Sequence, residues 1–136
     1  AWVYSSFGKN FVKTMIRLMN ERPEISVVSD QQGAPTYARD LAKAILDLIA
    51  NGQWAAGIYH YTNEGAITWY DFAVAIKQLI NSNCVVNPIP SSAYPTPAKR
   101  PSYSVLDKSS FKNTFQLDIP YWEDSLKKCI EIIEGA

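Results

Sequence analysis

The sequence has no excess of charge of either sign. Its 136 residues include 13 lysines and arginines and 13 aspartates and glutamates, which leaves a formal net charge of zero. Neither sign forms a run long enough to make a charged stripe, and such stripes are what capture nucleic acids and membrane surfaces. We therefore expect neither a nucleic acid nor a membrane as a partner.

Long apolar runs are missing as well. Charged residues interrupt the apolar stretches every few positions, so none approaches the roughly 20 residues that cross a bilayer, and no signal peptide is recognisable. With 47% hydrophobic residues, the chain still has enough apolar material for one domain's core. We expect a globular, cytoplasmic protein.

Cysteine and histidine are scarce. Cys84 and Cys129 are the only cysteines and stand far apart, without the Cys-x-x-Cys spacing of zinc or redox sites. Cys129 shares a helical face with apolar residues, which indicates a packing role. His60 is the only histidine and lies in the alternating run Ile58–Tyr61, where a strand residue is the expected reading. No acid or nucleophile stands at a spacing that would orient it for catalysis.

Glycine-rich motifs are also absent. The six glycines are dispersed, no Gly-x-Gly-x-x-Gly follows a strand, and no Tyr-x-x-x-Lys pair occurs. These motifs bind dinucleotides and supply tyrosine proton donors, respectively. The residues of this chain therefore cannot assemble either site alone.

Apolar periodicity predicts alternating strands and helices. We expect strands at Trp2–Tyr4, Ile25–Val28, Gly57–Tyr61 and Val85–Ile89, and helices from Phe11 to before Pro23, from about Leu41 to Asn51, from Thr68 to Ile80, and from after Pro120 to Ile133. This alternation is typical of an α/β fold.

The segment Asp30–Thr36 connects the second expected strand to a helix. A glycine and a proline within seven residues indicate a fixed turn with polar side chains at the end of a strand, where α/β proteins bind ligands. An ordinary strand-to-helix connection is the alternative. Gln31 and Thr36 are the candidates for polar contacts with a ligand.

Prolines are concentrated in the segment Ser91–Ser102. They fix φ and disfavour helix at the preceding positions, which predicts a stiff, extended loop. Stiffness would pre-organise Tyr94, Lys99 and Arg100, whose side chains suit a ring face and an anion. A guanidinium can grip two phosphate oxygens at once.

Three of these side chains have structural alternatives. Arg100 can form an exposed salt bridge instead of binding phosphate. Tyr94 can cover the core instead of stacking on a base. Trp2, placed where the first strand ends, can be a core residue or the wall of a sugar pocket.

Five motifs occur in the order seen in the dTDP-4-dehydrorhamnose reductase family. They are Trp2-Val3-Tyr4, Gly8-Lys9-Asn10-Phe11 with Lys13-Thr14-Met15, Asp30-Gln31-x-Gly33-Ala34-Pro35-Thr36, Ser92-Ala93-Tyr94-Pro95-Thr96-Pro97-Ala98, and Arg100-Pro101-x-x-Ser104-x-Leu106. The chain resembles the C-terminal part of these extended short-chain dehydrogenases/reductases, from the strand after the catalytic helix to the last helix. The resemblance covers essentially all 136 residues.

This resemblance implies a fold and an activity. Residues 1–136 would be the substrate-binding C-terminal portion of the enzyme, with the last parallel strands of a Rossmann-like sheet and a small α/β subdomain. The chain begins without Met inside a strand-like run, so we expect the N-terminal dinucleotide-binding half to be missing. The whole enzyme would reduce the 4-keto group of dTDP-4-dehydro-β-L-rhamnose with NADPH or NADH. Its catalytic residues would all precede Ala1.

The resemblance also assigns residues to the substrate. Trp2 matches a tryptophan that contacts the sugar, and Tyr94 and Arg100 lie in the loop that closes over the nucleotide diphosphate. Asn10 and Gln31 belong to two of the matching motifs. We expect these five residues to bind the dTDP-sugar.

Two further positions concern the cofactor and a metal. Ala1 would lie near the nicotinamide. Some family members place a carboxylate after the Pro-Thr turn to bind a metal between subunits, whereas this chain has Arg39 there. We therefore expect no metal, with Asp40 serving as a surface or capping residue.

Other functions remain open at this level. The same superfamily contains regulatory or binding homologues without catalysis, and the chain can also be read as a self-sufficient interaction domain. A homodimer is a further expected association.

Overall fold

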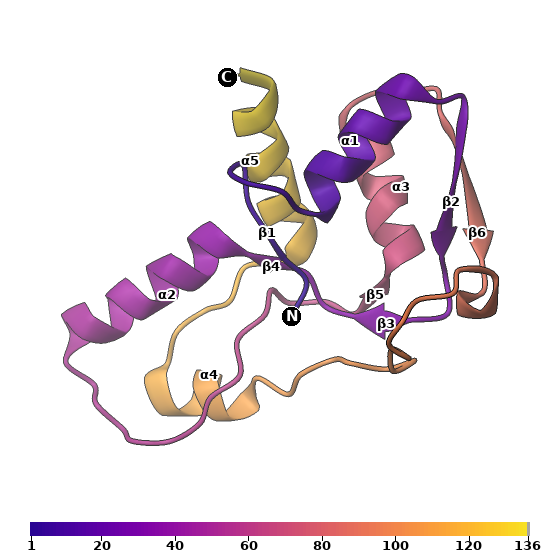
Figure 1. Ribbon diagram of the computed structural model, residues 1–136. Coiled ribbons are helices and arrows are strands. Elements are labelled where there is room, and N and C mark those ends of the chain that lie inside the picture. The colour runs from indigo at the N-terminus through magenta and orange to yellow at the C-terminus, as the bar shows by residue number, and fades with distance from the viewer. Residues whose placement is uncertain (136) are drawn as a thin grey trace.

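The computed structural model describes residues 1–135 of the chain and shows a mixed α/β fold (Figure 1). The strands are β1 (Val3–Tyr4), β2 (Glu24–Val28), β3 (Gln32–Gly33), β4 (Thr36–Tyr37), β5 (Ile67–Thr68) and β6 (Val85–Ile89). The helices are α1 (Phe11–Glu21), α2 (Ala38–Asn51), α3 (Trp69–Leu79), α4 (Ser109–Phe115) and α5 (Trp122–Gly135), with a 3-10 turn, η1, at Ser91–Ala93. The predicted α/β class is confirmed.

The strands form three small pairs. β1 pairs with β4 and β2 pairs with β6, both in parallel, whereas β3 and β5 are antiparallel. The parallel pairs need crossover connections, which α1 and α3 help to supply. None of the helices within residues 1–135 combines the length and the apolar content needed to cross a membrane.

The main core lies among α1, α3, α5 and the adjoining strands. Helical spacing aligns the apolar residues of each helix on one face, and burying that face is what stabilises the helices. The largest buried side chains there include Tyr4, Phe72, Ile76 and Leu126. Cys129 is fully buried in the same cluster, so its predicted packing role is confirmed.

A second, smaller core lies between α2 and α4, which Figure 1 shows side by side away from the main core. It contains Ala44, Phe111, Phe115 and Ile119. The sequence analysis did not predict α4. This helix has only seven residues, and its Ser-Ser-Phe-Lys-Asn-Thr-Phe sequence is poor in strong helix formers.

The strand expected at Gly57–Tyr61 does not form. Tyr59 and Tyr61 do turn to one side, where they contact Phe115 and Phe111. No strand within residues 1–135 pairs with this segment, and a strand needs a hydrogen-bonded neighbour. The alternation was therefore read correctly, but the strand prediction, including the strand position of His60, was wrong.

The apolar face of α2 is only partly buried. Ala44 is buried, but Ile45 and Ile49 keep 50% and 54% of their surface exposed. The described part of the chain therefore covers only about half of these two side chains. Periodicity identifies an apolar face, but it does not say what covers that face.

The side chain of Asn63 joins three elements at the centre of the molecule. Its Oδ1 accepts from the backbone N–H of Tyr37 at 2.8 Å, and its Nδ2 donates to the carboxylate of Asp40 at 2.7 Å and to the Ser125 hydroxyl at 3.0 Å. Ser125 also donates to Asp40. Because Asn63 and Ser125 are fully buried, each of these polar groups depends on the others for its hydrogen bonds.

We predict that Asn63→Ala lowers the free energy of unfolding by about 3 kcal/mol, because it leaves several buried polar groups without partners. Urea unfolding followed by circular dichroism measures this loss. Asn113→Ala makes the same substitution on the exposed face of α4 and should change stability by about 0.5 kcal/mol or less. Equal effects of the two substitutions would contradict the role of Asn63.

Candidate functional site

A pocket of about 480 Å³ opens between α1, β2 and the loop that follows β6. One face of α1 and the strand β2 form an apolar wall, and the loop contributes the polar side. The lining residues are Phe11, Thr14, Met15, Leu18, Arg22, Ile25, Ser26, Val27, Val28, Gln31, Trp69, Tyr94, Thr96 and Arg100. Apolar pockets with a few convergent polar groups are typical binding sites.

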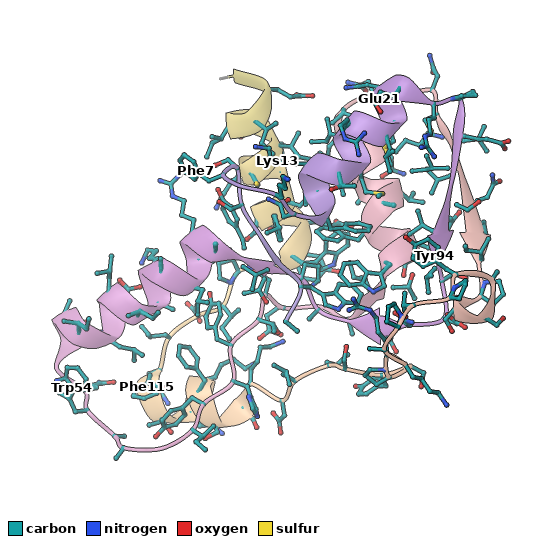
Figure 2. The ribbon with its side chains drawn as sticks, in the orientation of Figure 1. Phe7, Lys13, Glu21, Trp54, Tyr94 and Phe115 are labelled. Atoms are coloured by element: carbon teal, nitrogen blue, oxygen red, sulfur yellow. The ribbon has the colours of Figure 1, made fainter. Side chains whose placement is uncertain are left out.

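Three of the predicted substrate residues meet in this pocket. Gln31 approaches from the end of β2, and Tyr94 and Arg100 approach from the proline-rich loop. Figure 2 shows Tyr94 on the side of the molecule that carries β2 and β6. Outside η1 this loop has no helix or strand, which confirms the predicted loop; its stiffness stays a prediction. Lys99 is not among the lining residues.

The two arginines of the pocket carry its positive charge. Arg22 follows the C-terminus of α1, and Arg100 lies on the loop. The salt bridges formed within residues 1–135 involve neither guanidinium. The salt-bridge alternative for Arg100 is therefore wrong, and its guanidinium is free to bind an anion such as a phosphate.

Trp2 lies behind the pocket wall. Its ring stacks on Trp69, with ring centroids 3.6 Å apart and planes 16° apart. Trp69 lines the pocket directly. The backbone of Trp2 has φ of 53°, a left-handed conformation that costs energy for a bulky residue.

Gly33 makes room for that ring. A Cβ atom at this position would lie 2.7 Å from two ring carbons of Trp2 and 2.9 Å from Oγ of Ser104. Only glycine allows the Asp30–Thr36 turn and the indole to approach this closely. The turn therefore supports the tryptophan pair at one end of the pocket.

The other predicted residues have structural roles. The side chain of Asn10 caps α1 by accepting from the backbone of Lys13 at 3.2 Å, and it donates to the backbone of Ser5 at 2.7 Å. Thr36 is fully buried, and its hydroxyl donates to the carbonyl of Ala1 at 2.7 Å. Thr36 is thus not available to a ligand in the pocket, and Asn10 is not among the lining residues.

Sequence reasoning missed several pocket residues. Trp69 is the first residue of α3, directly after the capping residue Thr68. A large aromatic residue at the predicted start of a helix was the signal that could have identified it. Thr14 lies on the same side of α1 as Phe11 and Leu18, and Arg22 directly follows the helix. The outer edge of this face forms the pocket wall.

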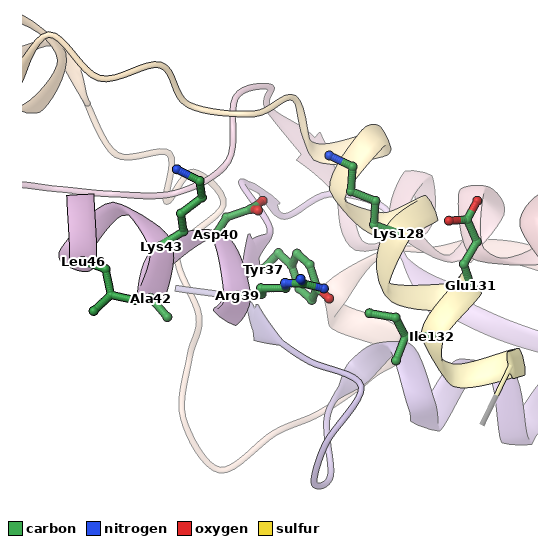
Figure 3. A pocket seen from close by; sticks show the side chains of 9 residues that line it. All are labelled: Tyr37, Arg39, Asp40, Ala42, Lys43, Leu46, Lys128, Glu131 and Ile132. Atoms are coloured by element: carbon green, nitrogen blue, oxygen red, sulfur yellow. The ribbon is translucent and has the colours of Figure 1, made fainter. Parts of the chain in front are cut away.

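A second, open pocket of about 750 Å³ lies between α2 and α5 (Figure 3). Arg39, Lys43 and Lys128 line it together with Glu131. Asp40 also borders it, but its carboxylate accepts from Asn63 and Ser125. Three cations do not suit a divalent metal ion, and no cluster of three metal-ligating side chains exists within residues 1–135. The absence of a bound metal stays a prediction.

A dinucleotide does not fit the residues of this chain alone. The left-handed glycines Gly8, Gly52 and Gly65 lie in three separate turns, and none belongs to a glycine-rich strand-to-helix turn that would cradle a pyrophosphate. Ala1 is exposed and could border a cofactor without holding it.

We predict that Gly33→Ala displaces the indole of Trp2 from Trp69, because the added Cβ overlaps the ring. The near-ultraviolet circular dichroism of the stacked tryptophans should weaken. The free energy of unfolding should fall by about 1 to 3 kcal/mol. Gly135→Ala, where a Cβ meets no atom within 4 Å, is the control. An unchanged tryptophan spectrum in Gly33→Ala would contradict this packing.

Comparison with known proteins identifies the family of this chain. The family model described as the RmlD substrate binding domain matches residues 1–134. The dTDP-4-dehydrorhamnose reductase of Burkholderia thailandensis is 39% identical to the chain over 146 aligned residues, which cover 95% of the chain and 48% of that protein. The chain thus spans about half the length of the curated relatives it matches.

Solved structures of dTDP-4-dehydrorhamnose reductases share the fold. The enzyme from Clostridium acetobutylicum superposes with a TM-score of 0.92 at 41% identity, covering 98% of this chain and 47% of that one. The enzyme from Bacillus anthracis, solved in complex with NADP, gives 0.87 at 42% identity, covering 95% and 45%. Because the family model spans nearly the whole chain, this chain belongs to the RmlD substrate binding domain family.

Proposed function

We propose that this chain is the substrate-binding portion of an NAD(P)H-dependent dTDP-4-dehydrorhamnose reductase, which converts dTDP-4-dehydro-β-L-rhamnose to dTDP-L-rhamnose. The observation that carries the proposal is the pocket in which Gln31, Tyr94 and Arg100 meet beside an apolar wall. Family membership and the names of the relatives support the same conclusion. The cofactor-binding half and the proton donor would belong to a longer protein.

The chemistry of the pocket suits a nucleoside diphosphate sugar. Arg100, with Arg22 as a second cation, would neutralise the diphosphate. Tyr94 offers a ring face to the base, and Gln31 offers amide hydrogen bonds. Trp69, backed by the stacked ring of Trp2, would form the wall at the sugar end.

The contribution of this chain to the reaction is binding and orientation. Holding the diphosphate at a fixed point places the 4-keto group relative to groups outside the chain, and such positioning lowers the entropic part of the barrier. Interactions with the nucleotide, remote from the reacting carbon, supply the binding energy for it.

We also propose that the protein acts in the cytoplasm as a homodimer. Cys84 and Cys129 are both free, as suits a reducing compartment. The partly exposed apolar residues Leu46 and Ile132 at the second pocket are compatible with a contact between subunits.

We predict that the full-length protein that this proposal requires oxidises NADPH or NADH when given dTDP-4-dehydro-L-rhamnose. Absorbance at 340 nm follows the reaction, and the same sugar nucleotide without protein is the control. Binding of dTDP without any turnover by the well-folded protein would contradict the enzyme proposal and favour a regulatory homologue.

We predict that Arg100→Ala weakens dTDP binding by about 1.5 to 3 kcal/mol, the range for a hydrogen bond to a charged group. Isothermal titration calorimetry with the full-length protein measures the loss. Arg17→Ala removes an exposed arginine of α1 that pairs with Glu21 and does not line the pocket, so it should bind as the wild type does. Unchanged affinity in Arg100→Ala would remove Arg100 from the site.

A further inference from the structure

The first residue of the loop that carries Tyr94 and Arg100 is hydrogen-bonded to the carboxylate of Asp30. Both carboxylate oxygens of Asp30 accept from the backbone N–H of Ser91, at 2.9 and 3.0 Å, and Oδ2 also accepts from the Ser91 hydroxyl at 3.0 Å. Ser91 is the first residue of η1, so its N–H has no partner within that turn. These hydrogen bonds hold the pKa of Asp30 below its usual value.

The other end of the loop is hydrogen-bonded to Gln32, which follows Asp30 by two residues in the chain. The backbone N–H of Gln32 donates to the carbonyl of Ser102 at 2.8 Å, and its carbonyl accepts from the N–H of Ser104 at 2.8 Å. The Ser104 hydroxyl donates to the same carbonyl at 3.2 Å. Both ends of the loop are therefore tied to residues 30–32.

Residues 30–32 are themselves held in place. Gln32 belongs to β3, which pairs with Thr68 of β5, and Ser29 donates to the carbonyl of Ile89 at 2.9 Å. The side chain of Gln31, between the two ties, lines the pocket. The segment 30–32 thus fixes the position of the pocket residue Gln31 and of both ends of the loop.

Between the ties the loop has little else to fix its position. Residues 92–102 are exposed, and Thr96 bonds only within the loop, to the carbonyl of Ala98. Three prolines, Pro95, Pro97 and Pro101, stiffen this stretch. A stiff arm transmits the position of its anchored end to the side chains it carries.

We propose that Asp30 is a positioning residue for the nucleotide diphosphate: its carboxylate fixes the start of the loop and so holds Tyr94 and Arg100 over the pocket. Ordinary hydrogen bonds at an exposed site compete with water, whereas bonds to an ionised carboxylate are stronger. Because it names how the substrate pocket is held together, this inference rests on the proposed function.

The first test needs no ligand. Hydrogen exchange of the backbone amides, read by mass spectrometry, should speed up over residues 91–104 in Asp30→Ala, while α5 keeps its wild-type exchange. Asp30→Asn keeps one acceptor for the N–H of Ser91 but loses the negative charge, so its exchange over 91–104 should lie between the wild type and Asp30→Ala. Asp118→Ala, in the connection between α4 and α5, is the control. Unchanged exchange over 91–104 in Asp30→Ala overturns the tie.

The second test is a double-mutant cycle on dTDP binding by the full-length protein. Arg100→Ala should weaken binding about tenfold to 150-fold. If Asp30 acts through the loop, Asp30→Ala weakens binding in the wild type severalfold more than it does in the Arg100→Ala background. The inference is overturned if Asp30→Ala weakens binding by the same factor in both backgrounds. It is also overturned if the Asp30→Ala protein binds dTDP as the wild type does.

The two ideas fail in different ways. No binding of dTDP by the wild type contradicts the proposed function and the positioning role together. Wild-type binding combined with a multiplicative cycle contradicts only the role of Asp30.

Discussion

The buried amide of Asn63 is the interaction on which the arrangement of the elements depends. It links the backbone at the start of α2 with Asp40 of that helix and Ser125 of α5. It also donates to the carbonyl of Pro120 at 3.2 Å. The apolar cores on either side are non-directional, so they do not choose one relative placement of the helices. A fully satisfied polar network does choose one, because any other placement leaves buried groups without partners.

The segment Asp30–Thr36 connects this polar network to the pocket. Its far end enters β4, which pairs with β1 and receives the Asn63 bond at Tyr37. In its middle, Gly33 lacks a Cβ atom and so leaves room for the ring of Trp2. Its near end accepts the hydrogen bonds of the proline-rich loop. One short stretch of chain therefore joins the core both to the tryptophan pair and to the proline-rich loop of the candidate site.

The helices and the segments that form the candidate site were largely predictable from the sequence, whereas the pairing of strands and the burial of helix faces were not. The four long helices were identified because their apolar spacing recurs over at least three turns, which is a strong local signal. The strand expected at Gly57–Tyr61 failed because hydrogen-bonded pairing involves a second segment. In the site, the sequence did not indicate that the side chain of Asn10 caps α1, and its contact with a substrate stays a prediction.

The sequence by itself determined the α/β class, the absence of a self-contained dinucleotide site and the likeness to one reductase family. Each of these depends on local spacing or on ordered motifs. Only the tertiary structure decided that Trp2 stacks on Trp69, that Arg100 has no carboxylate partner within residues 1–135, and that Asp30 holds Ser91. Asp30 and Ser91 are 61 residues apart in the chain, and contacts of that kind form only when the packing of whole elements brings the two ends together.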